Sequence, residues 1–151
     1  MRVGAWTAAL VAALAFAGCG GGDDDSEPGD IGHSYSASAH KEVLCKANVA
    51  AVRCLAVDPK WDPPSFAPRC QGDEKPAIEI VGGEGQANFV CWAGPPPNAD
   101  VRTFKARGSG FSTKTVICES VRGGFRCQKR DSPDARFELT DEDFSLNRSG
   151  Y

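Results

Sequence analysis

Short alternating runs of apolar and polar residues cover most of the chain, and clusters of glycine, proline, asparagine or aspartate separate them. Such alternation is typical of half-buried β-strands, and no segment repeats its apolar residues with the helical period over any length. The runs predict strands at Val43 to Lys46, Val52 to Val57, Ala77 to Val81, Ala87 to Trp92, Val101 to Lys105, Phe111 to Glu119, Phe125 to Gln128 and Arg136 to Leu139. The pattern predicts a small all-β domain built from hairpins, either a sandwich or a partly open barrel.

One segment near the C-terminus departs from this pattern. Thr140 is followed by Asp141, Glu142 and Asp143, which has the form of a helix start, with a threonine N-cap and acids in the first turn. We therefore expect a short helical turn that runs through Leu146.

The segment that contains Cys118 and Cys127 predicts a hairpin with a defined register. If these two cysteines face each other, Glu119 faces Arg126 and Gly123 lies in the turn. Opposed Cα atoms in a non-hydrogen-bonded antiparallel pair are about 4.5 Å apart, near the lower end of the range for a disulfide. An opposed glutamate and arginine favour the same register, and glycine supplies the positive φ of a tight turn. We expect a Cys118–Cys127 disulfide and a Glu119–Arg126 pair.

The remaining cysteines extend this scheme. Cys45 and Cys54 have the same spacing and are expected to form a second hairpin disulfide, although that register also opposes two basic residues. Cys70 and Cys91 then pair by elimination among the 15 connectivities that six cysteines allow.

The first residues resemble an export signal. Arg2 precedes a nearly uncharged run from Val3 to Ala17, which is too short to span a membrane. Phe16-Ala17-Gly18-Cys19 resembles a bacterial lipobox, which implies cleavage before Cys19 and lipid attachment to it. The alternative is an ordinary secretory cleavage after Ala17. Because the chain has seven cysteines, lipidation of Cys19 leaves an even set of six.

The segment that follows Cys19 is rich in glycine and acids, without apolar side chains from 20 to 30. We expect a signal peptide at 1–18, a disordered tether at 19–33 and a single β domain at 34–148. The net charge of the whole chain is −3. Arg2 and five of the acids lie in residues 1–30, so 16 of the 17 basic and 15 of the 20 acidic groups remain in residues 31–151.

Two proline-rich stretches are expected to be ordered loops. Asp58 to Pro68 is predicted to lie over the core, held by Trp61 and Phe66. The second stretch, Gly94 to Asn98, is expected to be stiff. The loop aromatics, together with Trp92, are predicted to form a lid over a small β core; the alternative is a ligand groove.

The order of the cysteines, Trp61-Asp62-Pro63-Pro64, Gly124-Phe125-Arg126-Cys127 and the closing Arg136-Phe137-Glu138-Leu139-Thr140 together resemble a family of exported actinobacterial proteins. That family is known only as a domain of unknown function. The resemblance covers about Ser38 to Phe144. It supports the cysteine order and implies no reaction, ligand or catalytic residue.

Catalytic and metal-binding patterns are weak. The two histidines, His33 and His40, lie at or before the expected start of the fold, and exported cysteines are better used in disulfides than as zinc ligands. Ser38 and Lys41 match Ser-x-x-Lys, but the companion motifs of penicillin-binding proteins are absent. Three candidate carboxylates for glycosidase chemistry, none of them placed near another by the sequence, are Glu79, Glu84 and Asp100. We predict no catalytic residue, no metal site and no cofactor.

Basic residues gather in the second half of the domain. They could attract anionic lipid head groups or cell-wall polymers, although an ordinary mixed-charge surface explains them as well. The strongest candidates for contact with an anion are Arg122, Lys129 and Arg130; the others are Arg102, Lys105, Arg107 and Lys114. Arg126 belongs to the same basic group but is expected to pair with Glu119.

The sequence thus predicts a cell-surface lipoprotein: a non-enzymatic binding or structural domain on the outer face of the cytoplasmic membrane. Its expected partners are the membrane, through the N-terminal lipid, and a cell-wall polymer or an envelope protein; export argues against nucleic acid. The alternatives are a secreted chain and a small hydrolase or inhibitor directed at the cell wall.

Overall fold

The computed structural model describes residues 34–83, 86–105 and 107–147. The regular secondary structure in these ranges consists of β-strands alone, which confirms the expected all-β fold. The strands are β1 (Ser34–Ala37), β2 (Val43–Ala47), β3 (Ala51–Ala56), β4 (Lys75–Val81), β5 (Asn88–Trp92), β6 (Val101–Thr103), β7 (Gly110–Ser112), β8 (Val116–Val121), β9 (Gly124–Lys129), β10 (Arg136–Thr140) and β11 (Phe144–Asn147). The signal peptide, the tether and His33 lie outside the described residues.

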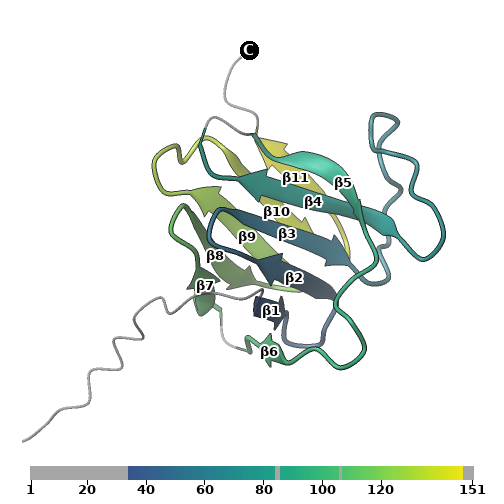
Figure 1. The fold of residues 1–151 in the computed structure, drawn as a ribbon, viewed down its shortest axis with the longest axis horizontal. Coiled ribbons are helices and arrows are strands. Elements are labelled where there is room, and N and C mark those ends of the chain that lie inside the picture. Colours follow the sequence, from purple (N-terminus) through teal and green to yellow (C-terminus); the bar gives the residue numbers. More distant parts are fainter. Residues whose placement is uncertain (1–33, 84–85, 106, 148–151) are drawn as a thin grey trace, which may run out of the picture.

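The strands form two sheets. A six-stranded sheet has the order β5-β4-β3-β2-β1-β6, and a five-stranded sheet has the order β11-β10-β9-β8-β7. Neighbouring strands are antiparallel except β1 and β6, which are parallel. Figure 1 shows the dark-blue and teal strands β2 to β5 of the first sheet overlapping the green-to-yellow strands of the second. One buried apolar cluster draws residues from both sheets, so the fold is a sandwich.

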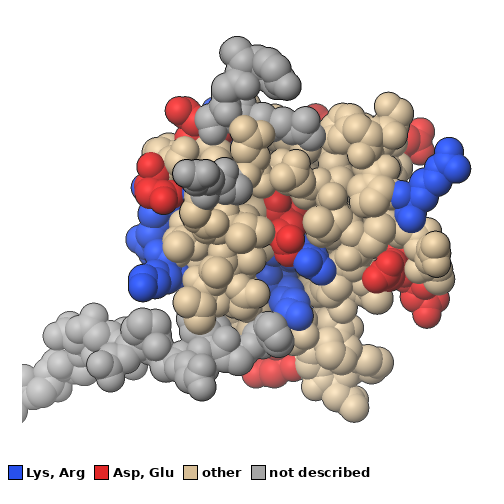
Figure 2. All heavy atoms as spheres, turned by 45° about the horizontal axis from the view of Figure 1, so that its top comes forward, with Lys and Arg blue, Asp and Glu red and all other residues tan. Residues whose placement is uncertain are grey.

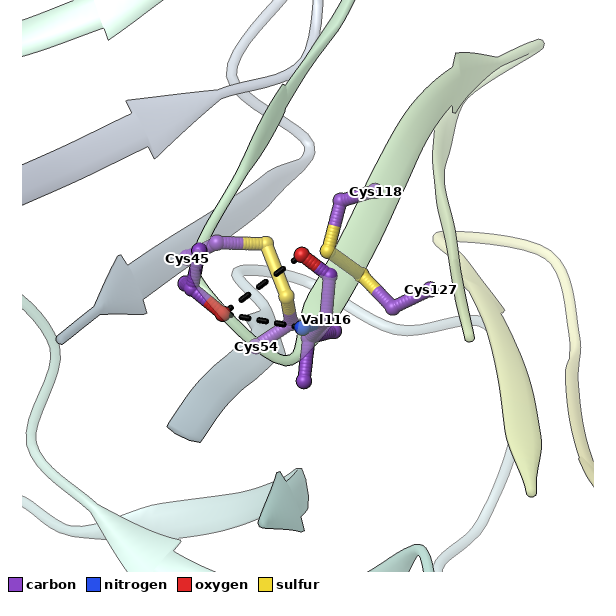
Figure 3. Close-up of a disulfide and its surroundings, with 6 residues drawn as sticks. Cys45, Cys54, Val116, Cys118 and Cys127 are labelled. Atoms are coloured by element: carbon purple, nitrogen blue, oxygen red, sulfur yellow. Dashed lines mark hydrogen bonds between the residues drawn. A yellow bond between two sulfur atoms is a disulfide. The ribbon is translucent and has the colours of Figure 1, made fainter. Parts of the chain in front are cut away.

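Two disulfides lie at the centre of this shared cluster. Cys45–Cys54 joins β2 to β3 in one sheet, and Cys118–Cys127 joins β8 to β9 in the other. All four cysteines are at most 1% exposed. Figure 3 draws the two bridges in one close-up, with Val116 of β8 beside them. Each bridge therefore contributes to the core as well as cross-linking its hairpin.

Both predicted hairpin registers are confirmed. Cys118 pairs with Cys127 and Cys45 with Cys54, each with a Cα–Cα distance of 4.1 Å. The like charges that oppose each other in the first hairpin are Lys46 and Arg53. Arg53 turns instead to the next strand, where its guanidinium binds Glu79 of β4 at 2.6 Å. A third strand thus relieves the repulsion that the isolated hairpin would have.

The third disulfide, Cys70–Cys91, is also confirmed. It ties the long connection between β3 and β4 to β5, which is an edge strand of its sheet. Unlike the four core cysteines, both of its cysteines are partly exposed. The bridge therefore fastens a loop at the surface of the sandwich.

The expected C-terminal helical turn is wrong. Thr140 N donates to Asp143 O at 2.9 Å, and Thr140 Oγ1 accepts a hydrogen bond from Asp143 N at 2.9 Å, so the chain reverses and continues as β11. Phe144 and Leu146 pack against the core, and they face Leu139 and Phe137 of β10. Burial of these alternate side chains favours a strand, although a threonine N-cap uses the same type of local bond.

The predicted strand from Phe111 to Glu119 is likewise divided by a threonine turn. Thr113 N donates to Val116 O at 2.8 Å, and Thr113 Oγ1 accepts from Val116 N at 2.9 Å. These bonds match those of Thr140. The segment therefore forms the separate strands β7 and β8.

The exposure of the cysteines predicts the order in which the disulfides are reduced. Thiol–disulfide exchange requires access to a sulfur, so limiting dithiothreitol under native conditions should open Cys70–Cys91 first. The measurement is alkylation of the new thiols followed by peptide mass spectrometry. Alkylation of Cys45 or Cys118 at the same rate as Cys70 would contradict the buried position of the two central bridges.

Candidate functional site

Four connections meet at one end of the sandwich and enclose an open groove of about 460 Å³. They are the β1–β2 turn, the β6–β7 connection, the β8–β9 turn and the β10–β11 turn. We call this hollow the turn groove. Its titratable lining residues are His40, Glu42, Lys105, Arg107, Arg122, Asp141 and Glu142.

Backbone geometry brings two of these turns into contact. Gly123 has a φ of 75°, which lets the tight β8–β9 turn close and leaves the adjacent Arg122 exposed. A Cβ atom at Gly123 would lie 2.8 Å from Asp141 Oδ1. Glycine therefore permits the close approach between this turn and the β10–β11 turn.

The carboxylates of the groove already have partners within the fold. Lys60 Nζ lies 3.0 Å from Asp141 Oδ2 and 3.7 Å from Glu142 Oε1. The hydrogen bond to Asp141, and then the charge of Asp141, raise the pKa of the Lys60 amine above its usual value. Glu42 Oε2 accepts from Ser38 Oγ at 2.9 Å and from His40 N at 3.2 Å.

Three cations of the groove, Lys105, Arg107 and Arg122, have no ion-pair partner among the described residues. All three are exposed. They come from two separate connections and converge on one hollow. The arrangement leaves positive charge available to an anion from outside.

The structure does not bring together the three residues that the sequence favoured for anion contact. Arg122 lies in the β8–β9 turn, whereas Lys129 ends β9 and Arg130 follows it, at the other end of the sandwich. Lys129 is 3% exposed, its amine donates to Gly83 O, and it lies 3.9 Å from Asp131 Oδ1. Arg130 Nε donates to Thr113 O at 3.3 Å.

Lys129 therefore joins the two sheets instead of presenting its charge to solvent. Gly83 belongs to the turn after β4 of the six-stranded sheet, whereas Lys129 belongs to the five-stranded sheet. The polar neighbours Gln128 and Arg130 do not indicate this role, because the partner of Lys129 is a backbone carbonyl distant in sequence.

The expected Glu119–Arg126 ion pair is also corrected. The two residues do face each other across β8 and β9. Arg126 nevertheless binds Glu138 of the neighbouring strand β10, with a distance of 2.7 Å from Nη2 to Oε2. Arg126 has a neighbouring strand on each side, and the sequence pattern considered only one of them.

Ser38 and Lys41 form part of the β1–β2 turn. Ser38 is 1% exposed, and its hydroxyl donates to Glu42 while accepting from Val43 N at 3.0 Å. Lys41 is exposed and has a φ of 63°. These bonds give the Ser-x-x-Lys sequence a structural role in reversing the chain.

The aromatic residues mostly serve packing. Trp61 contacts Phe144 and Phe89, and its Nε1 donates to Thr140 O at 3.1 Å, so the proline-rich loop bridges the edges of both sheets. Phe66 is 59% exposed and packs edge-on against Phe89. Trp92 lies instead on the opposite face of the six-stranded sheet, stacked on Tyr35.

The two candidate carboxylates that the structure describes, Glu79 and Asp100, do not form a pair. Glu79 binds Arg53, Asp100 is an exposed loop residue, and Glu84 lies outside the described residues. The described part of the chain contains no group of three or more His, Cys, Asp or Glu that could hold a metal ion. Figure 2 shows acidic and basic side chains interspersed on a surface that is otherwise mostly uncharged in this view.

No protein-family model, curated protein or solved structure matches the chain. Among the described residues no helix is long and apolar enough to cross a membrane. The three disulfides indicate that the protein folds in an oxidising compartment outside the cytoplasm.

Replacement of Lys129 by alanine should destabilise the fold by about 2 to 3 kcal/mol, because a hydrogen bond from a buried charged donor across the two sheets is lost. The measurement is urea unfolding at equilibrium. Lys114→Ala, which removes an equal charge from an exposed turn, is the matched control and should change stability by less than about 0.5 kcal/mol. Equal effects of the two substitutions would show that Lys129 is not a link between the sheets.

Proposed function

We propose that this chain is a lipid-anchored protein of the outer cytoplasmic membrane surface whose β-sandwich is a non-enzymatic binding domain. The proposed lipid anchor is supported by the pairing of all six cysteines from Cys45 onward in three disulfides. Cys19 is thereby left without a partner among them, in the lipobox-like position. Lipid attachment is the chemistry that gives this cysteine a use.

The contacts of the groove carboxylates support binding rather than hydrolysis. Asp141 and Glu142 bind one lysine amine, and Glu42 is held by the β1–β2 turn. A glycosidase needs one carboxyl group that keeps its proton and a second that is ionised, at a set separation. The free charges of the groove are cations, which suit ligand capture.

The anchoring is tested by the intact mass and location of the mature protein. We expect a chain that begins at Cys19, carries two or three acyl chains and sediments with membranes, because two or more chains give stable attachment. Cys19→Ala should remove the added mass and release any exported chain from the membrane. A wild-type chain that begins at Gly18 with a free thiol would contradict the proposal and support secretion.

The binding role is tested with purified cell-wall fragments. We expect the mature chain to co-sediment with the fragments while no new soluble saccharide or peptide appears during incubation. Prior reduction with dithiothreitol and alkylation should abolish the binding, since each disulfide stabilises the fold by roughly 2 to 4 kcal/mol. Release of soluble fragments by the native chain, lost on reduction, would favour the hydrolase alternative.

A further inference from the structure

We propose that the turn groove binds an anionic saccharide, with Lys105, Arg107 and Arg122 holding its anionic group and the groove carboxylates accepting hydrogen bonds from its hydroxyls. The inference deepens the proposed binding role by assigning its site and ligand class. It differs from the prediction made from sequence, because two of the three residues favoured there lie at the other end of the sandwich.

The cations are the first reason. Lys105, Arg107 and Arg122 are exposed, line one hollow and have no ion-pair partner among the described residues. Cations that converge on one hollow without an ion-pair partner leave positive charge available to an anionic ligand. Two guanidinium groups can each donate two parallel hydrogen bonds to a phosphate or carboxylate group, and the lysine adds a point charge.

The carboxylates are the second reason, and they restrict the class of ligand. Glu42 and Asp141 keep acceptor capacity after their contacts with Ser38 and Lys60, because an ionised carboxylate has about four lone-pair sites. Their charge disfavours an unbroken polyanion that fills the whole groove. A ligand with one anionic group among several hydroxyls matches both the cations and the carboxylates that line the groove.

The position of the groove is the third reason. The chain enters the fold at Ser34, which pairs with Ala47 next to the β2–β3 turn. The groove lies at the other end of β1, beyond Ala37. The groove and the point where the described chain enters the fold therefore lie at opposite ends of β1, so the entry strand itself leaves the groove open to a ligand from solvent.

The experiment measures binding of the mature chain to four probes by isothermal calorimetry at low and moderate salt. The probes are a phosphorylated dextran oligosaccharide, unmodified dextran of the same length, inorganic polyphosphate of matched charge, and monomeric dihexanoylphosphatidylglycerol. We expect the phosphorylated oligosaccharide to bind most tightly and more weakly as salt increases. Failure to bind it, or equal or tighter binding of any other probe, would overturn the assigned ligand class.

Variants locate the site. Arg122→Ala should weaken binding of the phosphorylated oligosaccharide roughly tenfold, and Arg122→Glu should weaken it further. The matched control is Lys114→Ala, which removes an exposed cation from the opposite end of the sandwich and should leave affinity unchanged. Thermal unfolding of each variant checks that the fold is retained. An equal loss with Lys114→Ala would assign the binding to overall charge and reject the groove.

These outcomes are separate from those of the anchoring test. A chain that proves to be secreted would overturn the lipid anchor and leave the affinities unaffected. A lipid-anchored chain whose groove binds none of the four probes would retain its location and lose the ligand assigned here.

Discussion

The packing of two disulfides into one core is the constraint on which the remainder of the structure depends. Cys45–Cys54 and Cys118–Cys127 each fix the register of a hairpin, and the two hairpins contribute strands to different sheets. Because a shift of one residue would move every inward side chain to the other face, each bridge determines which residues of its hairpin are buried. The registers in turn determine where the turns lie, and the turns at one end of the sandwich line the groove.

Much of the fold could be predicted because its signals are local. Cysteine spacing was sufficient for both hairpin registers, with a glycine turn as further support for the one closed by Cys118–Cys127, and alternation located most strands. The errors arose where one local sequence pattern is compatible with two different structures. The threonines at 113 and 140 make side-chain bonds that resemble helix caps, and only the partner strand decides that the chain reverses. Phe144 and Leu146 alternate with polar residues, which was the overlooked strand signal.

The site was harder to predict because its residues meet only through the fold. Lys129 and Arg122 looked equivalent as basic residues of one hairpin, but the length of β9 separates a solvated turn from a buried inter-sheet contact. Arg126 shows the same limit, since its partner is on the strand that the hairpin pattern did not include. Charge counts therefore identified the basic half of the domain but not the cations that remain free for a ligand.

The two core bridges stabilise the protein by filling the core as well as by cross-linking the chain. Cross-linking alone predicts a cost of about 2.7 kcal/mol for the shorter loop closed by Cys118–Cys127 and about 3.4 kcal/mol for the longer loop closed by Cys70–Cys91. The decisive measurement is the free energy of unfolding of the Cys118→Ala/Cys127→Ala and Cys70→Ala/Cys91→Ala variants. We predict the larger loss for the core pair. A larger loss for the Cys70–Cys91 pair would contradict the central place given to the buried bridges.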